Sequence, residues 1–512
     1  MSEEQSKPKG IDLAQGVPLV DVPEGGKIGG YVGEEPVLLA RHGGDLFAIS
    51  STCSHYSGPL AEGLIVGDTV RCPWHHACFS LRTGEAIGAP AFSPIPCWRV
   101  ESRDGKAFVR EKLQPREKRR SHTTGGDRGK PDRMIIIGGG AAGFAAAEML
   151  RREGFDGDLT LLSADDSAPY DRPNCSKDYL AGNALEDWMP LRPPSFYEDQ
   201  SIELELRAEV AAIDARARQV TLAQGRTMPF DKLLLATGAE PIRLDIPGSD
   251  QPHVHVLRSI GDSRAIIASA KEVRHALVLG ASFIGLEVAA ALRARGIEVH
   301  IVAPEHRPLE RVLGHEMGDF IRAIHEEHGV AFHLQNTAVS IDEDSVRLKD
   351  GSMLPAGLVV LGVGVRPRLD LAQRAGLNID RGVLVDEYLK TSAPAIYAAG
   401  DIARWPDPRS GEYRRIEHWV VAERQGQAAA RNMLGQGRRF SDVPFFWSQH
   451  YDVQINYVGH AENWDEIAIE GDIKAKNCLL RYKRKGRVVA AASIFRDLAN
   501  LEIELAIENG EA

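Results

Sequence analysis

Two glycine-rich turns, each set between an apolar run and an alanine-rich stretch, constrain the fold of this 512-residue chain most strongly. The first, GGGAAG at 138–143, follows the apolar run 134–137, and the second, GASFIG at 280–285, follows the run 276–279. A strand, a turn of this spacing and a helix start predict a parallel α/β unit whose helix N-terminus receives a dinucleotide pyrophosphate. Two such units in order favour two dinucleotides, FAD and a nicotinamide, over a coincidence of glycine turns in an ordinary α/β fold.

Each small residue of the first turn has an expected role. We expect Gly138 to allow the tight turn, Gly140 to let the pyrophosphate approach the backbone, and Gly143 to let the helix pack on the strand. Ala142 lies in the same turn and is assigned to cofactor binding with them. Asp165, 22 residues after Gly143, is the acid expected to hold a ribose hydroxyl.

The second turn departs from the pattern at one position. Ser282 stands between Gly280 and Gly285 where the middle glycine is expected, and it reduces access to the backbone. Glu305, 20 residues after Gly285, is the matching acid and favours NADH over NADPH because it would repel a 2′-phosphate. The neighbours that could instead accommodate that phosphate are His306 and Arg307.

Two cysteine–histidine pairs near the N-terminus predict a metal centre. Cys53 and His55 are separated by 16 residues from Cys72, which His75 follows. In a Rieske [2Fe–2S] centre two cysteines hold one iron and two histidines hold the other. A zinc site is the less favoured alternative, because zinc fingers group cysteines with cysteines and histidines with histidines.

Composition excludes several other classes of protein. The formal charge of −11 and a pI of about 5.9 argue against a nucleic-acid-binding protein. The longest run without a polar side chain, 134–147, is shorter than the roughly 18 residues that a membrane span needs. The acidic N-terminal residues predict neither a signal nor a transit peptide, so we expect a cytoplasmic protein. Six cysteines are too few for a disulfide framework.

The N-terminal motifs resemble those of Rieske ferredoxins. The residues 53–60 match C-x-H-x-x-G-x-L, and the residues 72–79 match C-P-W-H-G-x-x-F except that His76 stands in place of glycine. A Thr-Gly turn at 83–84 follows, as it does in that family. The resemblance implies that the ligands are Cys53, His55, Cys72 and His75.

The rest of the chain resembles FAD-dependent pyridine nucleotide oxidoreductases. The segment 391–401 ends in Gly400 and Asp401, and in that family the aspartate binds the ribityl chain of FAD. The segments 236–238 and 362–367 resemble the crossings between the two nucleotide domains. The resemblance adds to the cofactor-binding residues Thr237, Gly238, Gly364, Gly400 and Asp401.

One segment indicates which branch of this family the chain resembles. The residues 169–177 are similar to the P-Y-x-R-P-x-L-S-K segment of oxygenase-linked ferredoxin reductases and apoptosis-inducing-factor-like proteins. The resemblance implies that Arg172 and Lys177 contact FAD, with the lysine near the flavin ring. It also places Glu287, Glu417 and Trp419 at the nicotinamide and flavin edge, and the catalytic candidates are therefore Lys177, Glu287 and Glu417.

As a whole the chain resembles fused Rieske and apoptosis-inducing-factor-like reductases. The expected fold is multidomain: an all-β Rieske domain, two Rossmann-like α/β domains for FAD and NAD, and a C-terminal α+β domain. The segment 113–132, rich in Gly, Lys and Arg, is expected to be a linker, with a basic nucleic-acid arm as the less favoured alternative. The expected domains are Rieske 1–112, FAD-binding 133–255 and 379–438, NAD(P)-binding 256–378, and C-terminal 439–512.

These expectations lead to one hypothesis and two alternatives. Electrons would pass from NADH, or NADPH, through FAD to the cluster and then to an oxygenase or a cytochrome, with the linker letting the cluster move between partners. The first alternative is a disulfide or peroxide reductase that uses Cys175, which replaces the family leucine and is otherwise a small apolar filler. The second is a redox-sensing interaction protein, and a homodimer is possible in each case.

Overall fold

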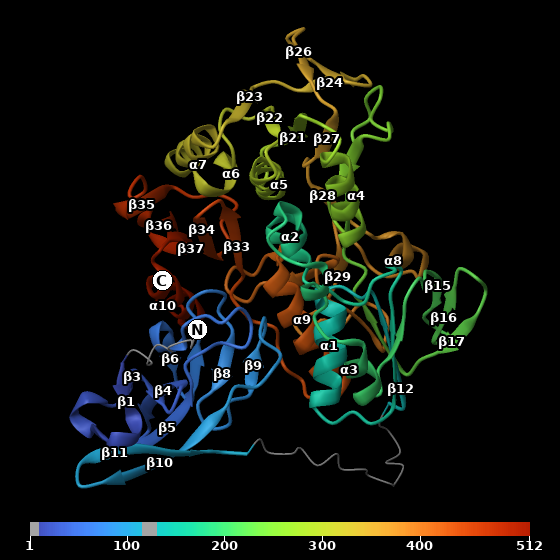
Figure 1. Cartoon of the computed structure of the whole chain (residues 1–512). Helices are drawn as coiled ribbons and strands as arrows, with labels where there is room; N and C mark the ends of the chain where they lie inside the picture. Colours follow the sequence, from blue (N-terminus) through green and yellow to red (C-terminus); the bar gives the residue numbers. More distant parts are fainter. Residues whose placement is uncertain (1–9, 115–130) are drawn as a thin grey trace, which may run out of the picture. The chain divides into compact units, whose positions relative to one another are not determined.

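A computed structural model describes residues 10–114 and 131–512 and divides the chain into two compact units. One unit contains the residues up to Thr123 together with Arg496–Ala512, and the other runs from Thr124 to Phe495. Figure 1 shows the elements of both units with the labels used below. The chain therefore passes from one unit to the other twice.

The N-terminal unit contains two β-sheets, in agreement with the expected all-β Rieske domain. Buried clusters lie on both faces of the larger sheet, one around Leu38 and Ile49 and the other around Leu39 and Trp98. The strands of the larger sheet, in spatial order, are β1 (Ile11–Asp12), β3 (Lys27–Val32), β4 (Glu35–His42), β5 (Asp45–Ser50), β10 (Cys97–Arg103), β11 (Lys106–Lys112) and β2 (Val17–Pro18). The strands of the smaller sheet are β6 (Leu64–Val66), β7 (Thr69–Arg71), β8 (Cys78–Ser80) and β9 (Ala86–Gly88).

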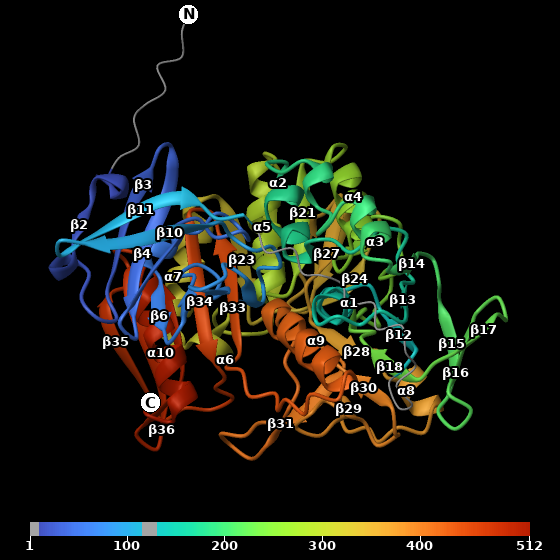
Figure 2. The same ribbon diagram turned by 90° about the horizontal axis from the view of Figure 1, so that it is seen from below.

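The last helix of the chain, α10 (Asp497–Asn509), belongs to this N-terminal unit. It lies beside β6, as Figures 1 and 2 both show. In the structure the residues from Arg496 onward pack with the β domain, and the expected C-terminal domain over 439–512 remains a prediction.

The second unit begins with a five-stranded parallel sheet. Its inner strands are apolar on both faces, which is why they read as continuous runs such as the one at 134–137, and helices cover them. The strand order is β14 (Glu203–Glu205), β13 (Asp158–Leu162), β12 (Arg133–Ile137), β18 (Lys232–Leu235) and β30 (Ile396–Ala398). Small residues let α1 (Ala141–Arg152) and α9 (Trp419–Met433) pack closely on each other (Figure 2).

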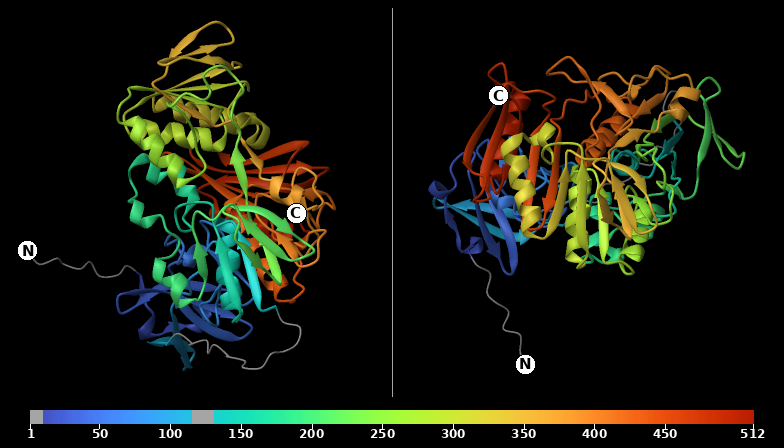
Figure 3. Two further views of the ribbon diagram at one scale, coloured as in Figure 1. Left: turned by 90° about the vertical axis from the view of Figure 1, so that its right-hand side faces the viewer. Right: turned by 90° about the horizontal axis from the view of Figure 1, so that it is seen from above.

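A second parallel sheet carries the second glycine-rich turn at the end of β21 (His275–Leu279). Its order is β20 (Val254–Val256), β27 (Leu358–Leu361), β21, β22 (Glu298–Ala303) and β23 (Val330–Leu334). Its helices are α4 (Ile260–Ala270), α5 (Phe283–Ala294) and α7 (His315–Glu327). A small antiparallel sheet forms its outer end (gold in Figure 3) and comprises β24 (Ala338–Ile341), β25 (Ser345–Leu348) and β26 (Met353–Pro355).

An antiparallel sheet completes the second unit. Its order is β33 (Phe445–His450), β34 (Val453–Gly459), β37 (Arg487–Ile494), β36 (Asn477–Arg484) and β35 (Glu466–Asp472). One face of it shares a buried cluster with the second parallel sheet, in which Ile455, Tyr457 and Tyr482 take part. No helix among residues 10–114 and 131–512 has the length and apolar character to cross a bilayer.

The contact between α1 and α9 leaves no room for a side chain at Gly426. A Cβ atom there would lie 2.2 Å from the carbonyl oxygen of Ala142, an atom fixed in the backbone of α1. We expect Gly426→Ala to lower the free energy of unfolding by about 1–3 kcal/mol and to lower the thermal unfolding midpoint. The matched control is Gly261→Ala in α4, where the nearest atom lies 3.5 Å from the added Cβ. Equal midpoints for the two variants would contradict this packing.

Candidate active site and metal centre

The first glycine-rich turn joins β12 to α1 and brings two backbone segments together. Gly138 has φ +116°, and a Cβ there would lie 2.1 Å from the carbonyl oxygen of Ala236, which follows the neighbouring strand β18. Gly140 is the N-cap of α1, and no side chain caps its free N–H groups. The turn therefore presents backbone donors and the positive end of a helix dipole, as an anion requires. Ala142 and Gly143 lie in the first turn of this helix.

Two arginines add positive charge beside this helix start. A Cβ at Gly140 would lie 3.0 Å from a terminal nitrogen of Arg172, and the Arg172 Nε is buried without a hydrogen-bond partner. Burial lowers the pKa of Arg172, and the charge of Arg258 lowers it further. Arg258 also forms an ion pair with Asp401. Buried positive charge with an unsatisfied donor fits the diphosphate of a dinucleotide.

The other expected FAD residues lie around this cluster. Asp165 follows β13 and accepts hydrogen bonds from Tyr170 Oη at 2.9 Å and from the Ser167 N–H. Gly400 follows β30 and donates its N–H to Gln425 of α9. Trp419 opens α9, and its ring lies 5.7 Å from the Arg172 guanidinium in a cation–π contact.

The crossing segments between the two nucleotide domains lie together, as expected from the sequence. The strands β19 (Ala239–Pro241) and β28 (Val365–Pro367) pair antiparallel, which aligns Thr237 and Gly238 with the end of β28. Thr237 Oγ1 donates to the carbonyl oxygen of Arg368, and Gly364 accepts from the Ile242 N–H.

Lys177 and Glu287, more than a hundred residues apart, form a buried ion pair. The Lys177 Nζ lies 2.9 Å from Glu287 Oε2, and Lys177 also donates to the Pro173 carbonyl oxygen. Glu287 is 5% exposed and accepts from the hydroxyls of Ser176 at 2.6 Å and Ser448 at 2.7 Å. Burial alone would raise the pKa of Glu287, but Lys177 and these hydrogen bonds together hold it below its usual value. The carboxylate is ionised and fixes the lysine ammonium.

The hydrogen bonds continue from Glu287 into the interface with the C-terminal sheet. Ser448 lies 3.2 Å from His450 Nε2, and His450 Nδ1 lies 3.2 Å from His325 of α7. The Tyr451 hydroxyl lies 3.4 Å from His325 Nδ1. Burial lowers the pKa of His450 to about 4, so the ring is uncharged at neutral pH. Sequence reasoning missed Arg258, Ser448 and His450, because no motif marks them.

The third catalytic candidate lies in a different cluster. Glu417 pairs with Arg415 at 2.5 Å, and the charges of Asp401 and Arg258 also act on it. Burial raises the pKa of Glu417. Its neighbour His418 packs against Phe446, with ring centroids 4.4 Å apart. The structure thus brings Lys177 and Glu287 together and groups Glu417 with the Arg258–Asp401 pair.

In the second glycine-rich turn the serine caps the helix. Gly280 has φ +108°, and Ser282 is the N-cap of α5. Ser282 Oγ accepts the Gly285 N–H at 3.2 Å and donates to the Gly362 carbonyl oxygen at 2.8 Å. In the second turn the Ser282 side chain therefore binds the N–H group of Gly285. In the first turn no side chain caps the N–H groups at the start of the helix. Glu305 follows the end of β22 and is half-buried.

The Rieske-like motifs form two loops of matching shape. In the first loop the Ser57 N–H bonds to the Cys53 carbonyl oxygen and Ser57 has φ +59°. In the second loop the His76 N–H bonds to the Cys72 carbonyl oxygen and His76 also has φ +59°. The histidine that replaces the family glycine therefore occupies the same left-handed position as Ser57.

The four expected ligands converge between these loops. Cys72 hydrogen-bonds to Cys53, which lowers the pKa of Cys53 and raises that of Cys72. The rings of His55 and His75 have centroids 5.0 Å apart, and burial lowers the pKa of His55 to about 3, which leaves the neutral imidazole that binds metal. Gly58 leaves space beside the thiols, since a Cβ there would lie 2.7 Å from Cys72 Sγ.

This arrangement fits a binuclear cluster. A [2Fe–2S] cluster of the Rieske type needs only two protein ligands for each iron, a thiol pair and an imidazole pair.

Cys175 has the properties of a packed thiol. It is 2% exposed within a hydrophobic cluster, and burial raises its pKa to about 12. A thiol that stays protonated at neutral pH is a weak nucleophile, so the structure does not support a reductase that uses Cys175.

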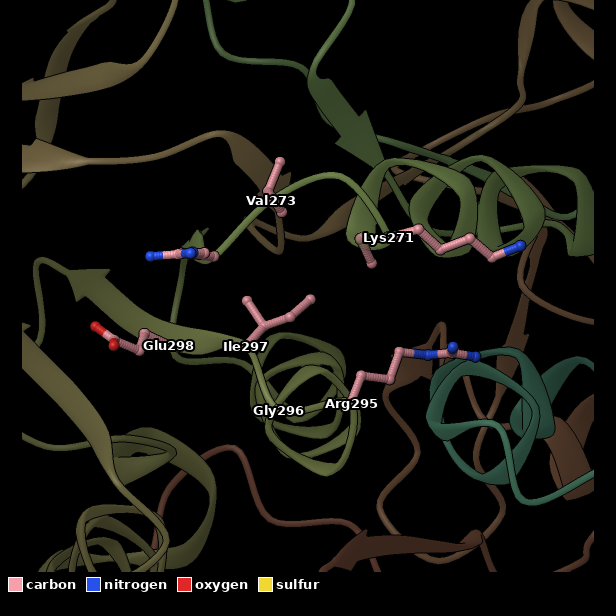
Figure 4. A pocket seen from close by; sticks show the side chains of 8 residues that line it. Lys271, Val273, Arg295, Gly296, Ile297 and Glu298 are labelled. Atoms are coloured by element: carbon pink, nitrogen blue, oxygen red, sulfur yellow. The ribbon is translucent and has the colours of Figure 1, made fainter.

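A surface pocket of about 480 Å³ (Figure 4) is lined by none of the residues expected to bind cofactors or metal. It lies where α4 and α5 end, and Lys271, Arg295 and Glu298 are among the residues that line it. Glu298 is the first residue of β22, so the pocket is at the opposite end of the strand from Glu305. Dinucleotides bind at the carboxyl ends of such strands.

The buried Lys177–Glu287 pair should make stability depend on pH. Breaking a buried pair by removing one partner costs about 3–5 kcal/mol, so Glu287→Gln should lower the thermal unfolding midpoint near neutral pH. The folded-state pKa of Glu287 is lowered, so its stabilisation is present above the unfolded-state pKa and is lost as the pH falls through the folded value. The difference in thermal unfolding midpoint between the wild type and Glu287→Gln should therefore become smaller at acidic pH. The exposed residue Glu298, changed to Gln, is the control, and a difference that is constant with pH would contradict the ion pair.

Three family models match the chain in the order of its motifs. They are the Rieske [2Fe-2S] domain over residues 17–99, the pyridine nucleotide-disulphide oxidoreductase family over 132–426, and the reductase C-terminal domain over 445–511.

Similar proteins agree with these matches. Apoptosis-inducing factor 3 of Mus musculus is 32% identical over 491 residues, which are 93% of this chain and 80% of that protein. The ferredoxin–NAD(+) reductase component of the anthranilate 1,2-dioxygenase system of Burkholderia cepacia is 35% identical over 71% of this chain and 91% of its own length. The covalent putidaredoxin reductase–putidaredoxin complex includes a chain that superposes with a TM-score of 0.72 and 31% identity, covering 74% of this chain and 93% of that one.

The geometry of the glycine-rich turns and the extent of these matches indicate the same family. The chain belongs to the pyridine nucleotide-disulphide oxidoreductase family, as a ferredoxin reductase-like, NAD(P)H-dependent flavoprotein that also carries a Rieske [2Fe–2S] domain.

Proposed function

We propose that the protein passes electrons from NADH through FAD to its own Rieske cluster and from there to an external protein acceptor, such as an oxygenase or a cytochrome. The observation that carries this proposal is that one chain presents both a dinucleotide site with buried positive charge and a pair of thiol–imidazole loops. When bound, the flavin accepts two electrons as a hydride and supplies them singly to the one-electron cluster. Two single-electron transfers to the acceptor balance each NADH oxidised.

The residues of the chain bind and orient in this scheme. Arg172, at the free N-terminus of α1, would hold the FAD diphosphate, and Asp401, oriented by Arg258, would hold the ribityl chain. Lys177 would be fixed beside the flavin ring by Glu287, because the ion pair leaves its ammonium group little freedom to turn away. Such a fixed positive charge favours the reduced, anionic flavin.

The relatives support an external acceptor. One similar reductase is a component of a dioxygenase system, and another was solved in a covalent complex with putidaredoxin. By analogy, this chain would reduce a protein partner, with its own Rieske domain preceding that partner in the electron path.

Anaerobic titration with NADH tests the order of transfer. The flavin absorbance of the purified holoprotein should bleach, and the electron paramagnetic resonance signal of the reduced Rieske cluster should appear with it. A flavin that bleaches while the cluster remains oxidised would contradict the internal transfer. A chain with Cys72→Ser, in which the cluster loses one ligand, is the control in which flavin bleaching should persist without the signal.

The surroundings of Glu305 lead us to propose a preference for NADH. The neighbouring cation Arg307 is held by Asp319 at 2.7 Å and lies 3.7 Å from Glu310, so its charge is already balanced. Glu305 should therefore repel a 2′-phosphate.

We expect Glu305→Ala to raise kcat/KM for NADPH relative to NADH by about tenfold, which corresponds to ~1.4 kcal/mol of lost repulsion. Glu298→Ala, at the other end of β22, is the matched control and should leave the ratio unchanged. An unchanged ratio for Glu305→Ala would show that this carboxylate does not face the nucleotide.

A further inference from the structure

The C-terminal helix contributes a buried carboxylate to the second cluster loop. Glu504 of α10 has no exposed surface, and its Oε2 lies 2.9 Å from His76 Nδ1. An ionised carboxylate only accepts hydrogen bonds, so His76 Nδ1 is the donor. His76 is equally buried and follows directly after the expected ligand His75. A residue more than 420 positions away thus contacts the neighbour of a cluster ligand.

A second contact attaches the same helix to the strand that leads into this loop. Arg71, the last residue of β7, lies 3.2 Å from Glu504 and 2.7 Å from Glu508. The two acids are four positions apart and therefore on one face of α10. An arginine guanidinium does not lose its proton in proteins. The guanidinium therefore stays charged and bridges the two acids.

These contacts exist only while α10 lies on the loop. A charged group without access to water is expensive unless it is paired and hydrogen-bonded, and Glu504 has its cationic and imidazole partners on this loop and strand. His76 also has a left-handed backbone conformation, which a non-glycine residue adopts at some cost. The contact with Glu504 gives a physical reason for a histidine at this position.

We propose that α10 is a clasp on the cluster-binding domain, in which Glu504 positions the second cluster loop through His76. The chain makes this clasp a tether, because only Phe495 and Arg496 separate the last residue of β37 from the first residue of α10. An extended chain rises at most ~3.6 Å per residue, so three steps span about 11 Å. While α10 stays on the loop, this short covalent connection therefore limits how far the cluster loops can separate from the end of β37.

The consequence for electron transfer rests on the proposed function, but the clasp itself does not. If the cluster visits an external acceptor, the clasp limits how far it can travel while attached. Residues 115–130 of the expected linker 113–132 lie outside the described residues.

The test compares variants of the oxidised, full-length holoprotein by hydrogen exchange. Glu504→Gln removes the buried charge, and we expect amide exchange in residues 497–509 and 72–77 to accelerate about tenfold or more, since hydrogen bonds to charged groups are the stronger class. The matched control is Glu508→Gln, whose side chain is 25% exposed and pairs with Arg71, and it should have a smaller effect on residues 72–77. Exchange in both segments that is unchanged by Glu504→Gln would overturn the proposal.

A pair of substitutions at His76 separates positioning from folding. His76→Asn keeps a donor near the place of Nδ1 and tolerates the left-handed conformation, so it should retain slow exchange. His76→Leu has no side-chain donor, so amide exchange in residues 497–509 and 72–77 should become faster. If His76→Leu retains slow exchange in residues 497–509, the hydrogen bond is not what holds the helix.

The cluster provides a readout that does not depend on turnover. The protein can be reduced chemically with dithionite, and the reduction potential and electron paramagnetic resonance spectrum can be recorded without NADH. Removal of a negative charge near the cluster favours the added electron, so Glu504→Gln should raise the potential more than Glu508→Gln does. Equal potentials and spectra in both variants would show that Glu504 does not position the loop. Because neither readout uses NADH, the clasp can be confirmed even if the proposed electron path fails, and the reverse also holds.

Discussion

The close approach of two backbones at each glycine-rich turn is the constraint from which the dinucleotide sites follow. At Gly138 the turn lies against Ala236, and at Gly280 it lies against Gly362, in each case the residue that follows the neighbouring parallel strand. A side chain at either glycine would push the two strands apart. Only with this contact in place does the following helix begin at the carboxyl edge of its sheet, where its N–H groups and dipole can receive a phosphate.

Two buried carboxylates beside this framework are paired with cations. Asp401 pairs with Arg258, and Glu287 pairs with Lys177 and accepts hydrogen bonds from two serines. Arg172 differs, because part of its guanidinium has no partner among the described residues. The pattern separates a structural role, in which the charge is balanced within the protein, from a binding role, in which an anionic cofactor completes the balance.

The sequence was informative where function depends on local spacing. The turns at 138–143 and 280–285, the strands before them, and the two cysteine–histidine loops lie where their motifs predicted. It was uninformative where partners come from distant segments. Arg258, Ser448 and His450 belong to no spacing pattern, and their contacts exist only because two domains pack around Glu287 and Asp401. The grouping of α10 with the N-terminal unit has the same origin, since the pairing of Glu504 with His76 is not encoded near either residue.

The matching shape of the two cysteine–histidine loops has a consequence for how the cluster is assembled. With Cys53, His55, Cys72 and His75 as the ligands, each loop would contribute a single sulfur and a single ring nitrogen, and each iron would take one ligand from each loop. A chain in which only one loop had formed would offer either iron just one protein ligand. Stable insertion of iron would therefore need both loops, and the iron content of a variant would report whether both loops have formed.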